Sequence, residues 1–583
     1  MSNNVDNLDP IDYYLKDLKQ AVIDNANTYF DDIVKKTKTN EEENKITADK
    51  IINETNSNND NEKQINKLKI IRILLIFIPV IGWLIIFLVI NKKLKALREQ
   101  GSEIQARLTK LHQEADAQLK AMKMGFRFND FNNIVRKSTK AFEVEDYFST
   151  EKLMMLTSLY NYQEDFSDQE SILEVMSGNI ATNPFLRVRV YREYEGQKAY
   201  TGSRTVHYTK TYRDSKGNLR TTTVSETLHA TINKPAPFYC TNTYTIYGNN
   251  AAPDLTFSRH PSGIGINPSQ KEVDKYVKSN SKELKKLADN AIKTGGTFTA
   301  LANEEFETFF KAYNRNHEAQ FRLLFTPLAQ QNMLELIKGK AGYGDDFSFY
   351  KQKKINIINS NHGKSIPDYN EFAYVNYYDL RKMKAQFVTD IKNIFDSIYF
   401  ELAPILAIPL YQMTDAGEFN IKEEYQANIT RFESEALVNN MNVKSLQHPD
   451  TKTNVILKST FVKKVGKSDV YSVKAYSFDA IPETEEVPVI AGNGHAYLVP
   501  VQYYRYEPLE QESYVWARQF NGNRDDYYKF IDSNEFKSDR EDVTSTITRN
   551  GCFVGGILTN DYTQQDEDKI SSQIEHFLDK INS

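Results

Sequence analysis

The 583-residue sequence contains only two cysteines, Cys240 and Cys552. Two cysteines can form at most one disulfide bond, so a framework of several disulfides is excluded. Two free thiols in a reducing compartment are the simpler interpretation, and we expect both side chains to be buried. The formal net charge is only −5, without the excess of basic residues that nucleic-acid-binding proteins usually carry. We therefore expect no nucleic-acid partner.

The sequence also lacks the local motifs of common catalytic and cofactor sites. It contains no G-x-x-x-x-G-K-[ST] phosphate loop, no H-x-x-x-H metal pair and no G-x-S-x-G nucleophile elbow. The glycine-containing segments 263–268 and 339–346 lack the strand-then-helix context of a nucleotide-binding loop. We therefore assign no catalytic, cofactor-binding or metal-ligating residue and expect no cofactor.

A few polar residues remain to be considered for chemistry. His207 and His229 fall on facing strands of a predicted hairpin and could approach each other, although exposed cross-strand neighbours are commoner than a two-histidine metal site. His495 would matter only if it lined a deep pocket. The acidic pairs Asp345–Asp346 and Asp525–Asp526 lie in turn-like sequence. Adjacent carboxylates on a loop usually diverge into water, which is unsuited to paired-carboxylate catalysis.

One long uncharged apolar run is present, at residues 73–90. A hydrocarbon core of about 30 Å requires roughly 20 apolar residues in a helix, so segment 70–90 is long enough to span a bilayer. The basic residues on its two sides are Lys67, Lys69, Arg72, Lys92, Lys93, Lys95 and Arg98. Such clusters suit anionic headgroups. The sequence therefore predicts a membrane segment, with the lipid bilayer as its partner.

The topology of this segment depends on Pro79 and Gly82 near its middle, because both residues can break a helix. We expect a kinked single span. The alternative is a re-entrant hairpin, which returns both basic flanks to the same face of the membrane. We expect no secretory signal peptide, since residues 1–66 are polar. We place the protein at the cell membrane, with the bulk of the chain on the cytosolic side, although two basic flanks do not fix the orientation.

Helices are predicted on both sides of the apolar run. Residues 1–66 form a polar helical region that begins at Asp9-Pro10, and its part 38–63 is expected to be a flexible or weakly helical connector. Residues 92–124 are predicted to form a helical stalk. Its heptad positions are Leu94, Leu97, Gly101, Ile104, Leu108, Leu111, Ala115 and Met122. We expect the stalk to pack within its own chain, and the alternative is pairing with a second copy.

The rest of the chain is predicted to be an α+β domain at 125–375 and a second α+β region at 376–583. Expected helices are 126–180, 270–293, 317–338 with a break at Thr326-Pro327, 378–403 and 565–581. Expected strands are 185–194, 206–214, 219–232, 238–247, 306–313, two within 347–358, and several within 453–520. The strands that hold Arg187, Arg189, Tyr191, Arg192, Arg204 and Arg213 resemble a nucleic-acid stacking platform in composition. A solvated antiparallel sheet face explains them better in an acidic chain.

Residues 306–337 carry a family resemblance. Their pattern is an F-x₃-F segment, an acidic-Ala helix, an apolar-T-P break and an L-x-L helix. The matching residues are Phe306, Phe310, Glu318, Ala319, Leu323, Leu324, Thr326, Pro327, Leu334 and Leu336. The segment resembles uncharacterised bacterial membrane-anchored proteins of unknown function, with the likeness covering about residues 65–360. The resemblance implies a membrane segment before an α+β domain, and it implies no activity.

These features predict an α+β protein with a helical N-terminal region, a membrane segment, a helical stalk and an antiparallel-sheet-containing globular region. The function expected from an anchor and a broad sheet without a catalytic motif is a non-enzymatic interaction or scaffold role with a protein partner. The alternatives are a membrane-anchored enzyme whose site is assembled from distant residues, and a surface-exposed adhesion-type protein.

Overall fold

The computed structural model divides the chain into two compact units. The hairpin unit comprises residues 14–139 and 366–396, and the sheet unit comprises residues 1–13, 140–365 and 397–583. The structure describes residues 9–78, 80–123, 125–126, 129–164, 166–296, 298–339, 341, 343–366, 374, 376–419, 425–519, 545–547, 553–558, 563–569 and 571–572. Cys552, Asp525–Asp526 and much of the predicted helix 565–581 lie outside these residues. This division combines parts of the two predicted regions 125–375 and 376–583 in one unit.

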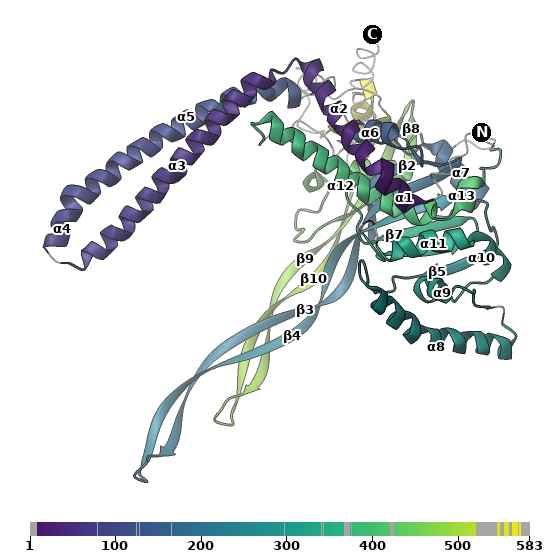
Figure 1. Cartoon of the computed structure of the whole chain (residues 1–583). Helices are drawn as coiled ribbons and strands as arrows, with labels where there is room; N and C mark the ends of the chain where they lie inside the picture. The colour runs from purple at the N-terminus through teal and green to yellow at the C-terminus, as the bar shows by residue number, and fades with distance from the viewer. Residues whose placement is uncertain are drawn as a thin grey trace. The chain divides into compact units, whose positions relative to one another are not determined.

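Two long antiparallel helices dominate the hairpin unit (Figure 1). They are α3 (Glu41–Ile76) and α5 (Asn91–Lys123). The other helical segments of this unit are η2 (Tyr14–Leu18), α2 (Lys19–Thr37), α4 (Ile81–Ile85), η3 (Ile86–Ile90), α6 (Asp130–Ser138) and the first part of α12 (Leu380–Leu406). At about 1.5 Å per residue, α3 and α5 are each roughly 50 Å long. The stalk therefore packs against its own chain.

The partner of the stalk is the segment that was expected to be a connector. Ile104, Leu108 and Ala115 of α5 bury their side chains in a cluster with Ile51 of α3. Polar side chains of α3 also bond across the pair: Asn61 Nδ2 donates to the Leu97 carbonyl at 2.8 Å. Residues 41–63 are helical because hydrogen bonds and the ion pair between Glu54 and Arg107 of α5 compensate for the weak apolar pattern of this segment.

The sheet unit contains two antiparallel sheets, so the α+β class and the antiparallel character are as predicted. The first sheet has the order β1 (Glu143–Val144), β2 (Glu170–Ile180), β3 (Asn183–Arg213), β4 (Leu219–Gly248), β7 (Ile355–Ser360), β6 (Phe347–Gln352), β5 (Thr256–Arg259). The second has the order β11 (Ser545–Ile547), β12 (Phe553–Leu558), β10 (Ala496–Gln519), β9 (Ser468–Ile490), β8 (Ile456–Val465).

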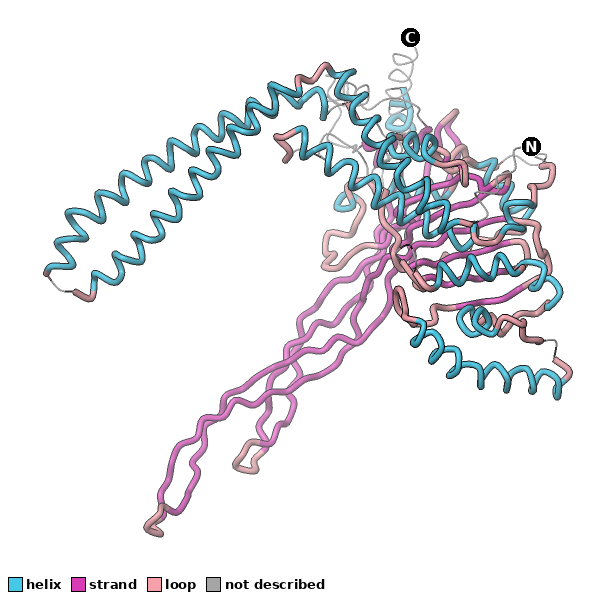
Figure 2. Tube along the Cα trace, in the orientation of Figure 1, coloured by secondary structure: helices cyan, strands magenta, loops and turns pink. Residues whose placement is uncertain are grey.

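Two very long β-hairpins, β3–β4 and β9–β10, extend out of these sheets and pack on each other (Figure 2). Strands of about 30 residues reach roughly 100 Å at 3.3 Å per residue. A small cluster of Val206, Leu228, Val499 and Val501 holds the two hairpins together. Gly202 permits a close approach, because a Cβ atom there would lie 2.1 Å from the Pro500 carbonyl oxygen. The predicted strands 185–194 and 206–214 thus belong to one continuous strand.

Prolines occur along the free edges of these hairpins. They are Pro235 and Pro237 of β4, Pro482 and Pro488 of β9, and Pro500 and Pro508 of β10. None of them lies where its strand pairs with a second neighbour. Proline has no N–H to donate, so it blocks the addition of a further strand at an exposed edge. Prolines at these unpaired positions therefore disfavour the addition of a further strand to the two ribbons.

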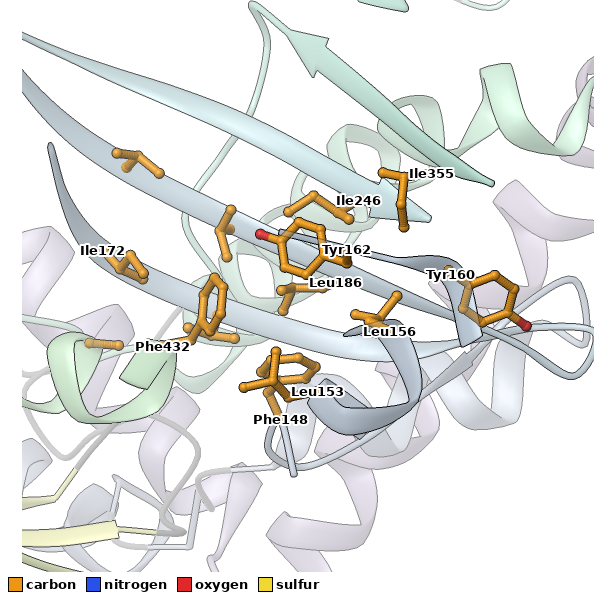
Figure 3. Packing of buried hydrophobic residues seen from close by; sticks show 14 residues of the cluster. Phe148, Leu153, Leu156, Tyr160, Tyr162, Ile172, Leu186, Ile246, Ile355 and Phe432 are labelled. Carbon is orange, nitrogen blue, oxygen red and sulfur yellow. The ribbon is translucent and has the colours of Figure 1, made fainter. Parts of the chain in front are cut away.

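The main apolar core of the sheet unit lies between the first sheet and the helices α7 (Thr150–Tyr160) and α14 (Arg431–Asn439) (Figure 3). Leu153 and Leu156 of α7 and Phe432 of α14 face Leu186 and Ile246 of the sheet. The remaining helical segments are α1 (Pro10–Tyr13), α8 (Gln270–Thr294), α9 (Glu304–Phe310), α10 (Glu318–Leu324), α11 (Pro327–Ile337), α13 (Pro409–Met413) and η4 (Val443–Ser445).

Two predicted elements are wrong in type. The expected helix 126–180 ends as strand β2, and the expected strand 306–313 is the helix α9. Asn303 begins α9 by accepting a hydrogen bond from the Phe306 N–H at 3.1 Å. Phe306, Phe309 and Phe310 then bury at helical spacing. By contrast, the predicted break at Thr326-Pro327 is confirmed, with Thr326 as N-cap of α11.

Candidate functional site at the tip of the helical hairpin

The histidines and acidic pairs considered for chemistry do not converge. His207 lies opposite Ser225, and His229 lies opposite Ser203, so the two histidines are four positions out of register, or about 13 Å along the hairpin. Asp345 pairs with Arg259 at 2.6 Å. Asp346 pairs instead with His362, with 2.5 Å between Oδ2 and Nδ1. The two histidines therefore do not approach each other, and the two-histidine metal site, which the sequence allowed but did not favour, does not form.

The arginines of β3 are engaged in the protein's own structure. Arg187, expected on a solvated face, is 1% exposed and bonds Glu174 and Glu401. Arg189 bonds the same Glu174, and Arg204 donates to the Leu498 carbonyl at 2.8 Å. These contacts explain Arg187, Arg189 and Arg204 without a bound polyanion. Cys240, expected to be buried, is a half-buried free thiol.

One group in the sheet unit has the composition of a catalytic triad but lacks its geometry. His362 bonds Asp346, yet its other ring nitrogen, Nε2, faces the carbonyl oxygen of Ser397 at 3.2 Å. The Ser397 hydroxyl donates to the backbone carbonyl of His362 at 3.0 Å and does not contact the ring. A nucleophile must lie within hydrogen-bond reach of its base. Across the described part of the chain, no group of three or more His, Cys, Asp or Glu residues could hold a metal ion.

The apolar run 73–90, by contrast, forms a distinct surface, which we call the apolar tip. The chain leaves α3 at Ile76, turns at Phe77, Ile78 and Val80, and returns through α4 and η3 into α5. The run is thus divided between two antiparallel arms, and it is not the single kinked helix that we expected. Among the residues that the structure describes, no helix is both long and apolar enough to cross a bilayer. The hairpin alternative matches this arrangement.

Local geometry explains why the chain reverses here. Val80 has a positive φ of 64°, which ends the helical path after α3. Gly82 is required by packing, because a Cβ atom there would lie 2.2 Å from the Leu75 carbonyl oxygen. The indole N–H of Trp83 donates back to the Ile76 carbonyl at 3.3 Å. Together these contacts pin the returning arm against the end of α3.

Nearly all large apolar side chains of the tip face solvent. Phe77, Val80 and Phe87 expose 79%, 75% and 77% of their surface. The other exposed members are Ile73, Leu74, Ile76, Ile78, Ile81, Trp83, Leu84, Ile85, Leu88 and Val89. On the returning arm, burial of large apolar side chains between the two helices begins at Ile90 and Leu94. A contiguous exposed apolar surface of this kind marks a contact with a partner or a membrane.

Exposed basic residues surround the base of the tip. This basic collar consists of Lys67, Lys69, Arg72, Lys92, Lys93, Lys95 and Arg98, and no acidic residue occurs between Glu62 and Glu99. Two pairs of side chains give the register of the antiparallel helices: Glu43 contacts Gln118, and Glu54 contacts Arg107. The midpoint in sequence of both pairs lies between residues 80 and 81. The same register places Lys69 level with Lys92. The two basic clusters therefore lie at one height.

The distance from the collar to the turn can be compared with a bilayer. From the level of Lys92 to the turn the returning arm contains about 11 residues, or roughly 16 Å of helix. That is about half of a hydrocarbon core of roughly 30 Å. Arg72 lies nearer the turn than the other members of the collar, and its side chain is long enough to reach back to their level. The tip has the dimensions of one leaflet.

Comparisons with protein-family profiles, characterised proteins and solved structures find no match to this chain. The resemblance of residues 306–337 to membrane-anchored bacterial proteins stays a prediction. The signals that define the tip, namely the apolar run, Pro79, Gly82 and the flanking basic residues, are all visible in the sequence. The sequence does not show whether the chain continues forward or reverses after the turn, and only the structure shows that it reverses.

Proposed function

We propose that the protein is a membrane-associated scaffold whose apolar tip inserts into one leaflet of an anionic bilayer. The observation that carries this proposal is the exposed apolar tip above an acid-free basic collar. Apolar side chains gain free energy when they leave water for the acyl chains, and the collar gains from anionic headgroups at the same depth. In this arrangement both arms of the hairpin emerge on the same side of the membrane. The sheet unit is then free to bind a protein partner from the cytosolic side of the cell membrane.

Vesicle flotation of the full chain tests the insertion. We expect the double variant Phe77→Asp/Phe87→Asp to bind vesicles that contain anionic phosphatidylglycerol at least 100-fold more weakly than the parent protein. Each aspartate in the hydrocarbon costs about 3 kcal/mol relative to phenylalanine. The control is Ile292→Asp, since Ile292 on α8 is also 79% exposed but lies outside the tip. Equal binding by the tip variant and the control contradicts the proposal.

The depth of insertion can be measured with the protein's own tryptophans. Trp83 lies in the tip and is 61% exposed, whereas Trp516 is fully buried in the sheet unit. The variant Trp516→Phe leaves Trp83 as the only tryptophan. We expect lipids brominated near the ends of their acyl chains to quench its fluorescence most strongly. Quenching that is strongest at the headgroup level, or tip-dependent oligomers in the absence of lipid, would indicate a surface contact or self-association instead.

A further inference from the structure

A cleft of about 390 Å³ lies between the two long β-hairpins, where β4 and β10 face each other. Glu193 and Glu195 of β3 line one part of it, and Phe478, Tyr503 and Tyr506 of the second hairpin line another. This volume lies within the range of small-molecule binding sites in proteins. The cleft is far from the apolar tip in sequence and belongs to the sheet unit, so nothing in the proposed membrane function accounts for it.

The cleft is preformed, because contacts on both sides of it fix the β3–β4 hairpin: to the β9–β10 hairpin on one side and to Asn454, before β8, on the other. Toward the β-turns, Gly202 meets the Pro500 backbone and the Val206 cluster seals the gap. Toward the sheets, the Tyr239 hydroxyl donates to the Asn454 carbonyl at 3.0 Å, and Asn454 Nδ2 donates to the Tyr191 hydroxyl at 2.6 Å. Between these two sets of contacts, Ala236 of β4 lines the cleft together with the tyrosines of β10.

The charges that line the cleft do not cancel. Lys234 is neutralised by Glu485, with 2.5 Å between Nζ and Oε2, and Arg505 is neutralised by Glu483 at 2.7 Å. Glu193 and Glu195 have no cation within 4.0 Å among the described residues. Burial raises the pKa of Glu193, and the neighbouring Glu195 carboxylate raises it further. A bound cation would relieve this repulsion.

We propose that the cleft binds an alkylammonium cation, with its charge at Glu193 and Glu195 and its chain against the aromatic rings. Ammonium groups are attracted to the faces of tyrosine and phenylalanine within about 6 Å, and Lys234 already lies 4.7 Å from the Tyr503 ring centre. A divalent metal is a poorer fit, because it requires about six oxygen ligands and the cleft supplies only two free carboxylates. A lysine side chain of a protein partner and a free polyamine share this chemistry.

Isothermal titration of the full chain with two ligands tests the assignment and separates the two sources. The ligands are spermidine and an Ac-Gly-Lys-Gly-amide peptide, each compared with its N-acetylated, uncharged form. Saturable binding is expected for at least one charged ligand, and tighter binding of the peptide identifies a protein lysine as the source. We expect Glu193→Gln/Glu195→Gln to weaken binding at least tenfold.

The matched control is Glu486→Gln, which removes an exposed carboxylate of β9 outside the cleft. This control is expected to bind like the parent protein. Circular dichroism must show the same melting temperature for both variants, since the two glutamates contribute no ion pair to the fold. The assignment is overturned if neither ligand binds, if the acetylated ligands bind equally well, or if both variants lose affinity to the same extent. None of these results depends on membrane insertion.

Discussion

The variant Lys351→Met is expected to be more stable than the parent protein at neutral and acidic pH, and the difference should vanish or reverse in alkali. Lys351 of β6 is completely buried. Its amine donates to the Ala251 carbonyl at 3.1 Å and to Asn356 Oδ1 at 3.4 Å. No carboxylate lies within 4.0 Å of it in the part of the chain that the structure describes. Burial lowers the pKa of Lys351 to about 7.

The sign of the effect follows from proton binding. The unfolded chain holds the proton up to a pKa near 10.4, whereas the folded protein releases it near pH 7. Between these values the unfolded state binds more protons, so the stability of the parent protein rises with pH. The lowered pKa of Lys351 reduces the free energy of unfolding of the parent protein by about 5 kcal/mol. This loss of stability has its full size below pH 7. Methionine removes this loss but also the two hydrogen bonds, which is why the order should reverse in alkali.

Urea denaturation at several values between pH 6 and pH 10 measures this difference. The control is Lys353→Met, because Lys353 lies in the adjacent turn and is exposed. The other titrating groups of the protein contribute equally to parent and variants, so only the difference between the curves matters. A stability difference between parent and Lys351→Met that does not change with pH would show that the buried amine keeps its proton.

The sequence predictions succeeded where residues close together in the sequence determine the structure. The helix α8 begins at Ser269 with a capping box to Glu272, and the turn at 215–218 joins two alternating strands, so both were predicted closely. The position of the apolar run was clear from its composition, and its membrane role stays a prediction. Its topology was not clear, because Pro79 and Gly82 are compatible with a kink as well as a reversal. Packing of Gly82 on the Leu75 carbonyl decides between them.

The failures share one cause, which is a partner distant in sequence. Segment 38–63 is polar, and its residues 41–63 are helical because α5 bonds them across the hairpin. The aromatic segment at Phe306 looked like a strand, but its rings pack in a cluster with Phe257 and Phe349. The β-hairpin cleft was equally inaccessible, since the pairing of Lys234 with Glu485 joins residues about 250 positions apart. One sequence does not reveal such contacts.

The second large effect concerns Arg187, which the alternating pattern of β3 placed on a solvated face. Its guanidinium donates to Glu401 at 2.5 Å and 3.1 Å, to Glu174 at 2.6 Å and to the Lys364 carbonyl at 2.7 Å. All three charged side chains are at most 3% exposed. Burial lowers the pKa of Arg187, but the carboxylates of Glu401 and Glu174 outweigh it and raise the pKa overall. The arginine therefore remains charged and holds two buried acids.

Replacing this arginine by methionine is expected to destabilise the sheet unit by about 3–5 kcal/mol, because Glu401 loses its counter-ion in a buried site and Glu174 keeps only Arg189, at 3.3 Å. Lysine should recover only part of this loss, since it cannot reproduce the forked geometry of guanidinium. The triple variant Arg187→Met/Glu174→Gln/Glu401→Gln removes the arginine and both buried acids together. Because the remaining Arg189 is partly exposed to water, the triple variant should recover most of the stability in urea denaturation. If the triple variant is as unstable as Arg187→Met, the loss arises from packing around the arginine and not from uncompensated charge. Recovery in the triple variant would show that a buried charge cluster connects β3 to α12. The alternating sequence of β3 predicted exposed arginines and did not reveal this cluster.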